Sequence, residues 1–223
     1  MDKRLIGILA VIAAVFIGIA VLSGHSKKST GSSNSSAQPT SHITGSGKTG
    51  VKLQEYGDYQ CPVCEAYYQP LKQVVAKYSD QIFFQFSNLP LVQVHPNAFA
   101  AARAAEAAGL QNKYWQMHDL LYDNQSTWAS SRNPITFYNQ YAQNLGLDMT
   151  KFKKDYASSQ VNDYINADLA AFQKTGQEEG TPSFFLDGKY IANSQLVDQN
   201  GLPSVDKFSA VIDKEIANKT QHQ

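Results

Sequence analysis

The chain is poor in residues that bind metal ions. It has two cysteines and five histidines among its 223 residues. His25 and His42 fall in a stretch rich in small polar residues, and His222 is next to the C-terminus. Only His95 and His118 remain for the folded part, and their spacing does not match that of paired metal ligands. Because a structural zinc site needs four ligands and a catalytic one usually takes three from the protein, we expect no metal site.

An excess of charge of one sign is also missing. Lysine and arginine together number 19, and so do aspartate and glutamate, with no basic cluster along the chain. A nucleic-acid-binding surface needs such a cluster to neutralise phosphates. The sequence therefore excludes nucleic acid as an expected partner. It also contains no internal repeats.

Long apolar runs are limited to one, close to the N-terminus. Residues 5–22 contain no charged or strongly polar side chain, and they follow the basic Lys3 and Arg4. As a helix this run would be about 27 Å long, close to the roughly 30 Å hydrocarbon core of a bilayer. We therefore predict that residues 1–4 are cytoplasmic, that residues 5–23 form a transmembrane signal anchor, and that the rest is translocated. A cleaved signal peptide is the alternative, with Val21-x-Ser23 as a weak cleavage site.

Acidic residues are absent from residues 24–50, which are rich in Ser, Thr and Gly. A stretch of this composition behaves as a flexible coil with a root-mean-square span of roughly 30 Å. We expect it to be a disordered linker between the anchor and a folded domain over residues 51–223. The domain's roughly 170 residues are enough to bury a substantial core.

From residue 51 onward the hydrophobic periodicity predicts an α/β domain. Period-two alternation predicts a strand at 51–58, and a strongly apolar and aromatic run predicts another at 81–91. The Asp187-Gly188 turn signal predicts a hairpin at 183–192. Helical periodicity predicts helices at 62–78, 98–108, 113–122, 134–145, 149–157, 161–175 and 205–216. This order indicates an α/β fold with a helical insertion at about residues 95–176.

The two cysteines, Cys61 and Cys64, lie in the segment CPVC at the predicted start of the 62–78 helix. A disulfide here would close only four residues and stabilise the fold by about 2 kcal/mol, against about 4.7 kcal/mol for a hundred-residue loop. Structural stapling is therefore a weak explanation, although an idle oxidised pair remains an alternative. A cysteine at a helix N-terminus has a stabilised thiolate, and Pro62 suits the first helical position. We interpret Cys61 as the attacked and attacking sulfur and Cys64 as the resolving one.

Four segments resemble the DsbA-like family of thioredoxin-fold thiol-disulfide oxidoreductases. They are EYGDYQCPVC, HPNAFAAARAAEAAG, KYWQMHDLLYDNQ and GTPSFFLDGK. The resemblance covers the chain from residue 51 to the last helix. It implies a thioredoxin fold with an inserted helical domain, preceded here by the anchor and linker, and a Cys-x-x-Cys motif at the start of the first helix.

The resemblance also implies roles for residues outside the motif. Thr181 and Pro182 match the family's cis-proline loop, which faces the disulfide and pairs with substrate backbone; an ordinary turn before a strand is the alternative. Glu55, six residues before Cys61, matches a buried acid beneath the active site. Its place on the apolar face of the first strand predicts a raised pKa and a proton relay with Cys64. A strand-edge glutamate that reaches solvent is the alternative.

The inner residues of the motif, Pro62 and Val63, are expected to tune the redox chemistry. In the best-known oxidising members of the family the second inner residue is a histidine that stabilises the thiolate, whereas the Val63 side chain has no charge or donor. Each pKa unit of lost stabilisation corresponds to about 1.4 kcal/mol, or about 30 mV for this two-electron couple. We therefore predict a less oxidising potential than in histidine-bearing relatives, and the direction of electron flow stays open.

The predicted function is that of a thiol-disulfide oxidoreductase tethered to the bacterial cell membrane, with its catalytic domain outside the cytoplasm. Its expected clients are unfolded or folding proteins with cysteines, and the resemblance implies a membrane redox partner of the DsbB or vitamin-K-epoxide-reductase type and no bound cofactor. A reductase or isomerase with the same site is one alternative, and a tethered peptide-binding, chaperone-like module is another.

Asp58 is expected to be a loop residue, and His95 and His118 to be packing or hydrogen-bonding residues.

Overall fold

The computed structural model describes residues 38–221. The transmembrane anchor predicted at residues 5–23 lies outside this range, as does the first half of the predicted linker. Within residues 38–221, no helix combines the length and the apolar character that crossing a membrane requires.

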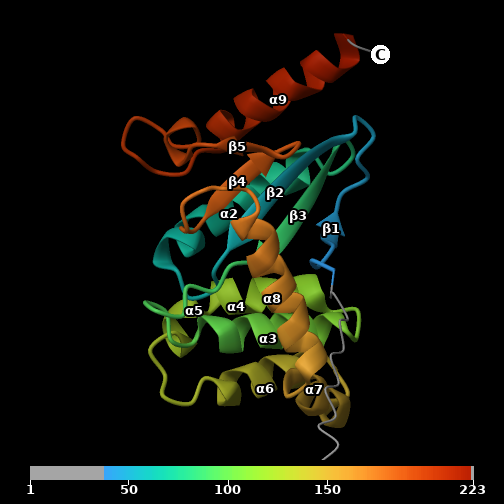
Figure 1. Cartoon of the computed structure of the whole chain (residues 1–223), viewed down its shortest axis with the longest axis vertical. Helices are drawn as coiled ribbons and strands as arrows, with labels where there is room; N and C mark the ends of the chain where they lie inside the picture. The colour runs from blue at the N-terminus through green and yellow to red at the C-terminus, as the bar shows by residue number, and fades with distance from the viewer. Residues whose placement is uncertain (1–37, 222–223) are drawn as a thin grey trace, which may run out of the picture. The chain divides into compact units, whose positions relative to one another are not determined.

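A mixed sheet of five strands lies at the centre of the described domain (Figure 1). Its strands, in spatial order, are β1 (His42–Thr44), β3 (Ile82–Asn88), β2 (Val51–Gly57), β4 (Ser183–Leu186) and β5 (Lys189–Ile191). β2 and β3 run parallel, and the other neighbours pair antiparallel. Parallel strands need a crossover connection, and helix α2 (Pro62–Lys77) supplies it between β2 and β3.

Most of the helices lie in the chain between β3 and β4. They are α3 (Ala98–Gly109), α4 (Tyr114–Asp123), α5 (Gln125–Trp128), α6 (Ile135–Asn144), α7 (Met149–Tyr156) and α8 (Ser159–Gln173). The 3-10 turn η2 (Asn193–Gln195) and helix α9 (Val205–Gln221) follow the β4–β5 hairpin. In Figure 1, α3, α4, α6 and α7 lie below the sheet, while α9 lies above it. Helices α3 to α8 thus fill the place of the predicted helical insertion.

The two faces of β2 pack against different helices. Leu53 is fully buried in the larger hydrophobic core, to which α2 and α9 contribute their apolar faces. Tyr56 points to the other face, where it packs against Phe172 of α8 and Phe185 of β4. Because side chains alternate along a strand, Glu55 shares the face of Leu53, on the side of α2.

Local sequence signals account for several element boundaries. Cys61 is the N-cap of α2, with an extended backbone, and Pro62 takes the first helical position. Asp148 caps α7 by accepting two backbone N–H groups of its first turn. Asp187 and Gly188 have φ values of +49° and +79°, the left-handed conformation that a two-residue hairpin turn requires. The predicted helix start and hairpin are therefore confirmed.

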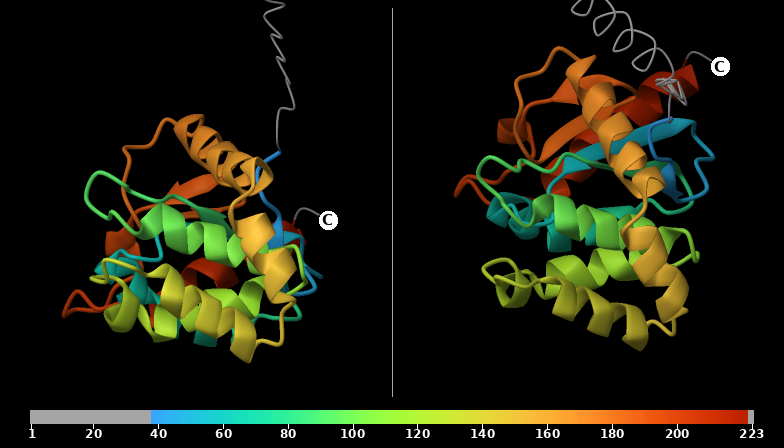
Figure 2. Two further views of the ribbon diagram at one scale, coloured as in Figure 1. Left: turned by 90° about the horizontal axis from the view of Figure 1, so that it is seen from below. Right: turned by 60° about the horizontal axis from the view of Figure 1, so that its bottom comes forward.

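The predicted linker is wrong at its C-terminal end, because residues 40–44 belong to the folded domain. Thr40 is buried, and its backbone N–H and hydroxyl donate to the Asp168 carboxylate at 2.8 and 2.7 Å. His42–Thr44 forms β1, the edge strand paired with β3, and Figure 2 shows this segment in blue near α8. A stretch of small polar residues favours a coil only where it has no bonding partners. Here the edge of β3 pairs with residues 42–44, and the buried Asp168 carboxylate accepts hydrogen bonds from Thr40. The folded domain therefore begins before residue 51.

Candidate active site

Cys61 and Cys64 lie at the start of α2, close to the C-terminal end of β2. Both are free cysteines in this structure. The Cys61 backbone N–H donates to the Asp58 carbonyl at 3.1 Å, and the Cys61 carbonyl accepts from the Gln125 amide at 3.0 Å. Cys64 is fully buried, and its Sγ accepts the Asp58 backbone N–H at 3.5 Å. The strand-end loop and the helical insertion therefore both hold the motif in place.

The surroundings of Cys61 favour its thiolate. A hydrogen bond from the Cys64 thiol lowers the pKa of Cys61, and so do the backbone N–H groups of Cys64 and Val63. Burial acts in the opposite direction, and the net result is a pKa of about 5. Cys61 is therefore a thiolate at neutral pH, which is the form that attacks and leaves in disulfide exchange.

Cys64 has the opposite character. Burial raises the pKa of its thiol well above the usual value, and the hydrogen bond to Cys61 and the charges of Cys61 and Glu55 raise it further. Cys64 therefore keeps its proton while Cys61 carries the charge. The two sulfurs differ because one sits at a helix cap and the other in the core.

Glu55 lies on β2 between Phe86 of β3 and Phe184 of β4. Its residue is 3% exposed, and none of residues 38–221 donates a hydrogen bond to its carboxylate. Burial, together with the charge of Cys61, raises the pKa of Glu55 to about 8. The structure confirms the buried position expected from the alternation of this strand, and Glu55 is not a strand-edge residue that reaches solvent.

A cavity of about 180 Å³ reaches the Glu55 side chain between α2 and α4. Apolar and aromatic side chains form most of its lining, among them Leu71 and Trp115. Lys72 and Asp119, which also line it, pair at 2.8 Å and are both partly exposed. The cavity is large enough to hold water, and neither cysteine lines it.

The loop before β4 lies next to the motif. The Thr181-Pro182 peptide bond is cis, as predicted. The Cys61 Sγ lies 3.6 Å from the Thr181 carbonyl oxygen, although the two residues are 120 positions apart in the sequence. The Pro182 carbonyl accepts from the Asn193 side chain at 2.9 Å, which fixes the loop to η2.

Val63 acts on Cys61 through its backbone. Its side chain points outward, since the residue is 49% exposed, while its backbone N–H is one of the donors to the Cys61 sulfur. A valine at this position lacks the side-chain donor of a histidine, but it keeps the backbone N–H donor that every non-proline residue has. The less oxidising potential expected from Val63 stays a prediction.

Asp58 has more contacts than its predicted loop position implied. Its side chain is fully buried, and its carboxylate accepts the backbone N–H groups of Gln60 at 2.7 Å and Leu91 at 2.9 Å. The His95 imidazole is its third partner, at 2.7 Å. The bond to Gln60 is an Asx turn, for which an aspartate after a strand is a local sequence signal. The contacts with Leu91 and His95 have no such signal.

His118 packs in the core, as expected. Its ring lies against Phe86, Trp115 and Tyr122, and its Nδ1 is 3.0 Å from the Tyr59 hydroxyl. Burial lowers the pKa of His118 to about 3. The imidazole is therefore neutral at physiological pH and has a packing role.

Comparisons with known proteins agree with this geometry. A family model described as thioredoxin matches residues 37–214. The structure is similar to that of a thioredoxin-like oxidoreductase from Silicibacter pomeroyi DSS-3, with a TM-score of 0.62, 24% identity, and coverage of 80% of this chain and 93% of that one. It is similar to oxidised BdbD from Bacillus subtilis, with a TM-score of 0.65, 21% identity and coverage of 82% and 97%. It is also similar to α-DsbA1 from Wolbachia pipientis, with a TM-score of 0.67, 20% identity, and coverage of 82% of this chain and 94% of that one. At these identities the solved structures show a shared fold.

The curated relatives are longer proteins. The Na(+)/H(+) antiporter NhaA 1 of Salinispora arenicola is 34% identical over 153 residues, which are 66% of this chain and 22% of that protein. The Na(+)/H(+) antiporter NhaA 3 of Salinispora tropica is 33% identical over 148 residues, with the same coverage of 66% and 22%. The chain thus spans about a fifth of the length of the curated relatives it matches.

Proposed function

This chain belongs to the thioredoxin family and has the DsbA-like architecture, and we propose that it is a thiol-disulfide oxidoreductase that uses Cys61 and Cys64 as its dithiol/disulfide pair. One observation carries the proposal: Cys61 caps α2 beside the cis-proline loop, whereas Cys64, one turn further along the helix, is fully buried. The pKa of Cys61 is about 5, whereas that of Cys64 is raised well above the usual value. A stabilised thiolate next to a protected thiol is the arrangement that disulfide exchange needs.

The oxidising reaction has two exchange steps. A client thiolate attacks the Cys61 sulfur of the Cys61–Cys64 disulfide, the S–S bond breaks, and a mixed disulfide between the client and Cys61 forms. Cys64 leaves as a thiolate and takes up a proton. A second client thiolate then attacks the client sulfur of the mixed disulfide and expels the Cys61 thiolate. The client gains a disulfide, and the protein retains the two electrons as a dithiol.

Glu55 is the proposed source of the proton for Cys64. A carboxyl group with a pKa of about 8 is protonated at neutral pH and can transfer its proton to the Cys64 thiolate. The cavity at Glu55 then allows the proton to be replaced from solvent. Thr181 and Pro182 border Cys61, and we assign them the pairing with the backbone of an extended client.

Oxidation is the proposed direction of the reaction in the cell. A low thiolate pKa stabilises the reduced protein, and a stabilised reduced form makes the disulfide a stronger oxidant. The proposed clients are cysteine-containing proteins that fold outside the cytoplasm, with the enzyme held at a bacterial cell membrane through residues 5–23. A membrane partner of the DsbB or vitamin-K-epoxide-reductase type would remove the electrons. The sulfur atoms themselves carry the electrons, so the mechanism uses no bound cofactor.

The first experiment mixes the oxidised protein with a reduced two-cysteine peptide and follows peptide oxidation. We expect rapid oxidation by the wild type and a rate at least about a thousandfold lower for Cys61→Ser. With a second peptide, whose cysteine is already joined to a small thiol through a disulfide, we expect Cys64→Ser to form a mixed disulfide that accumulates. A chaperone-like module would bind the peptide equally well with and without Cys61 and would not oxidise it, which would contradict the proposal.

The direction needs a separate measurement of the reduction potential together with thiol trapping in growing cells. We expect a potential well above the roughly −270 mV of thioredoxins and a mostly oxidised pair. A thioredoxin-like potential with a mostly reduced pair would instead indicate a reductase or isomerase.

A further inference from the structure

An open groove lies beside the cysteine motif, and none of the roles assigned above uses it. Its volume is about 710 Å³. Pro62 lines it from the motif, Gln125 from α5, and His95 and Asn97 from the loop before α3. The loop after α5 closes the opposite side with Arg132. Because Pro62 is covalently joined to Cys61, the groove begins next to the residue whose sulfur would bond to a client.

Side-chain amides fix the walls of the groove. The Gln60 Nε2 donates to the Ala129 carbonyl at 2.7 Å, and the Gln60 Oε1 accepts the Asn97 backbone N–H at 2.6 Å. The Asn97 side chain donates to the carbonyls of Ala129 and Ser131 at 3.0 and 2.9 Å. These bonds join three segments that are far apart in the sequence, so the groove is preformed and does not need client binding to assemble.

His95 is held in a defined orientation in this wall. Its Nδ1 lies 2.7 Å from the Asp58 carboxylate, which is fully buried. Its side chain is 18% exposed, and its Nε2 bonds to none of residues 38–221. A buried carboxylate that binds one ring nitrogen fixes the imidazole and leaves the other nitrogen for a ligand.

Arg132 gives the groove a positive charge. The His95 imidazole faces the buried Asp58 carboxylate, and none of the described residues that line the groove is acidic. Arg132 is exposed and forms no ion pair within residues 38–221. Val63, next to Pro62, adds an exposed apolar side chain close to this region. A client segment with a carboxylate near its cysteine is therefore complementary in charge to the groove.

We infer that this groove binds the client polypeptide beside its reacting cysteine and prefers an acidic residue there, with Arg132 and His95 as the contacting side chains. The inference rests on the proposed function, because the client's sulfur must bond to Cys61. It adds a substrate class to that function: proteins in which aspartate or glutamate lies within a few residues of the cysteine to be oxidised.

The test uses the oxidised full-length chain and three two-cysteine peptides that are identical except for Glu, Gln or Lys beside the first cysteine. Their kcat/KM values are divided by each peptide's rate with oxidised glutathione, since neighbouring charge also changes the reactivity of a thiol. We expect the Glu peptide to exceed the Lys peptide by about fivefold at low ionic strength, the factor that one exposed ion pair supplies. Added salt should reduce this ratio.

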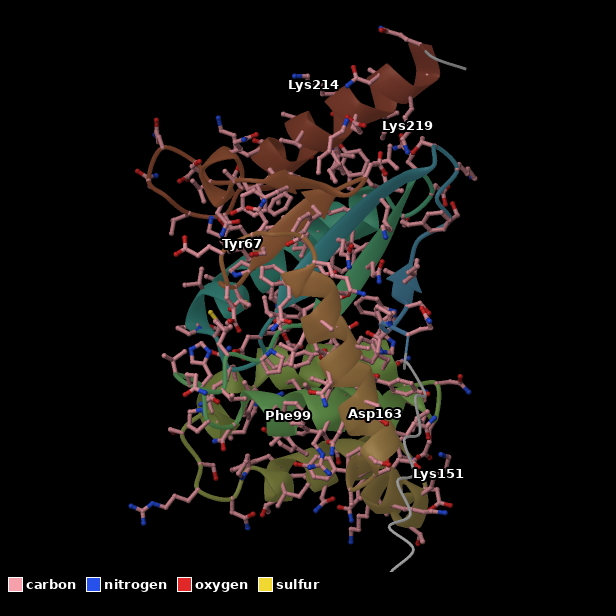
Figure 3. The ribbon with its side chains drawn as sticks, viewed as in Figure 1. Tyr67, Phe99, Lys151, Asp163, Lys214 and Lys219 are labelled. Atoms are coloured by element: carbon pink, nitrogen blue, oxygen red, sulfur yellow. The ribbon has the colours of Figure 1, made fainter. Side chains whose placement is uncertain are left out.

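Arg132→Glu should reverse the preference, so that the Lys peptide reacts faster than the Glu peptide. Lys214→Glu is the matched control, because it makes the same change of charge on α9, at the top of Figure 3 and far from α5 (Figure 1); its ratio should equal that of the wild type. Equal normalised rates for all three peptides would overturn the inference, as would equal shifts in the two variants. If no peptide were oxidised, the proposed function itself would fail.

Discussion

Glu55 and Asp168 are both buried carboxyl groups, and burial raises the pKa of both, but their hydrogen-bond partners differ. Glu55 accepts no hydrogen bond from residues 38–221, and its pKa is about 8. The Asp168 carboxylate accepts N–H and O–H groups of Thr40 and Asn88. These bonds lower its pKa against the effect of burial, and the net value is about 6.

The contrast shows how one chain builds two kinds of acid from the same chemical group. Without donors, a buried carboxyl group releases and recovers a proton near neutral pH, which is useful beside Cys64. With donors, a buried carboxyl group becomes a structural connection. Asp168 connects α8 with the end of β3 and with the segment that leads into β1, at a distance from the chemistry of the cysteines.

The largest expected effect is the loss of the Asp168 connection. Asp168→Ala leaves four donors from Thr40 and Asn88 without their acceptor, and each unsatisfied buried donor costs about 1–3 kcal/mol. We expect the free energy of unfolding, measured with urea, to fall by about 4 kcal/mol. Asp163→Ala, at an exposed position of the same helix, should change it by less than about 0.5 kcal/mol. A loss below about 1 kcal/mol in Asp168→Ala would show that the connection is not structural.

The second effect is a pH dependence of stability in two overlapping windows that end at different pH values. A carboxyl group whose pKa is raised by folding binds its proton more tightly in the folded state, so its stabilising contribution is present at low pH and is lost as the pH rises to the folded pKa. For Asp168 the loss runs from pH 3.8 to about 6, and for Glu55 from 4.5 to about 8. The Asp168 window corresponds to about 3 kcal/mol.

Urea unfolding of the disulfide form resolves these windows, because neither cysteine titrates in that form. The Glu55 window then reflects burial without the charge of the Cys61 thiolate, so its upper end lies below that of the reduced form. Relative to the wild type, Glu55→Gln should remove the decline that continues above about pH 6, to which Asp168 does not contribute, whereas Asp168→Asn should reduce only the decline below about pH 6. Identical pH profiles for the two variants would contradict the assignment of different windows.

The third effect is kinetic and concerns Glu55 alone. Glu55→Gln should slow the proton-dependent release of Cys64 at least about tenfold, because the amide cannot supply a proton. Its stability at pH 7 should exceed that of the wild type, because folding of the variant does not require the uptake of a proton at this position. Stopped-flow measurement of peptide oxidation from pH 6 to 9 tests this. An unchanged rate and pH profile would exclude Glu55 as the proton donor.

The smallest expected effect comes from removing one hydrogen-bond donor to the Asp168 carboxylate, which makes its surroundings more like those of Glu55. Thr40→Val removes the hydroxyl donor, which binds the Asp168 carboxylate at 2.7 Å, while keeping the backbone donor and most of the side-chain volume. We expect a loss of about 1 kcal/mol and a further rise in the pKa of Asp168, seen as a shift of its stability window to higher pH. If the window shifted to lower pH, hydrogen bonding would not be the cause of the contrast.

The features that the sequence predicted are those encoded in short stretches of chain. Alternation along β2 predicts the burial and raised pKa of Glu55, and the proline after Cys61 predicts the helix start. The cis-proline loop was accessible only through the family resemblance, because Thr181 and Cys61 are 120 positions apart. Helical periodicity in turn marks most of the insertion.

The features that the sequence did not predict depend on polar contacts between distant residues. Thr40 and Asp168 are 128 positions apart, and the small polar composition around Thr40 is indistinguishable from that of a coil. The pair of Asp58 and His95 is formed across 37 positions. Such contacts leave no periodic pattern, and a single side chain does not reveal its partner before the fold is known.

The protonation state of Cys61 is the central claim, and the ultraviolet absorbance of its thiolate as a function of pH tests it most directly. The absorbance of the reduced protein, corrected with the oxidised form, should follow a titration with a midpoint near pH 5. Cys64 should add no second step until a much higher pH. A single step near the ordinary cysteine pKa of 9.0 would mean that the motif does not stabilise a thiolate, and the proposed oxidoreductase mechanism would be wrong.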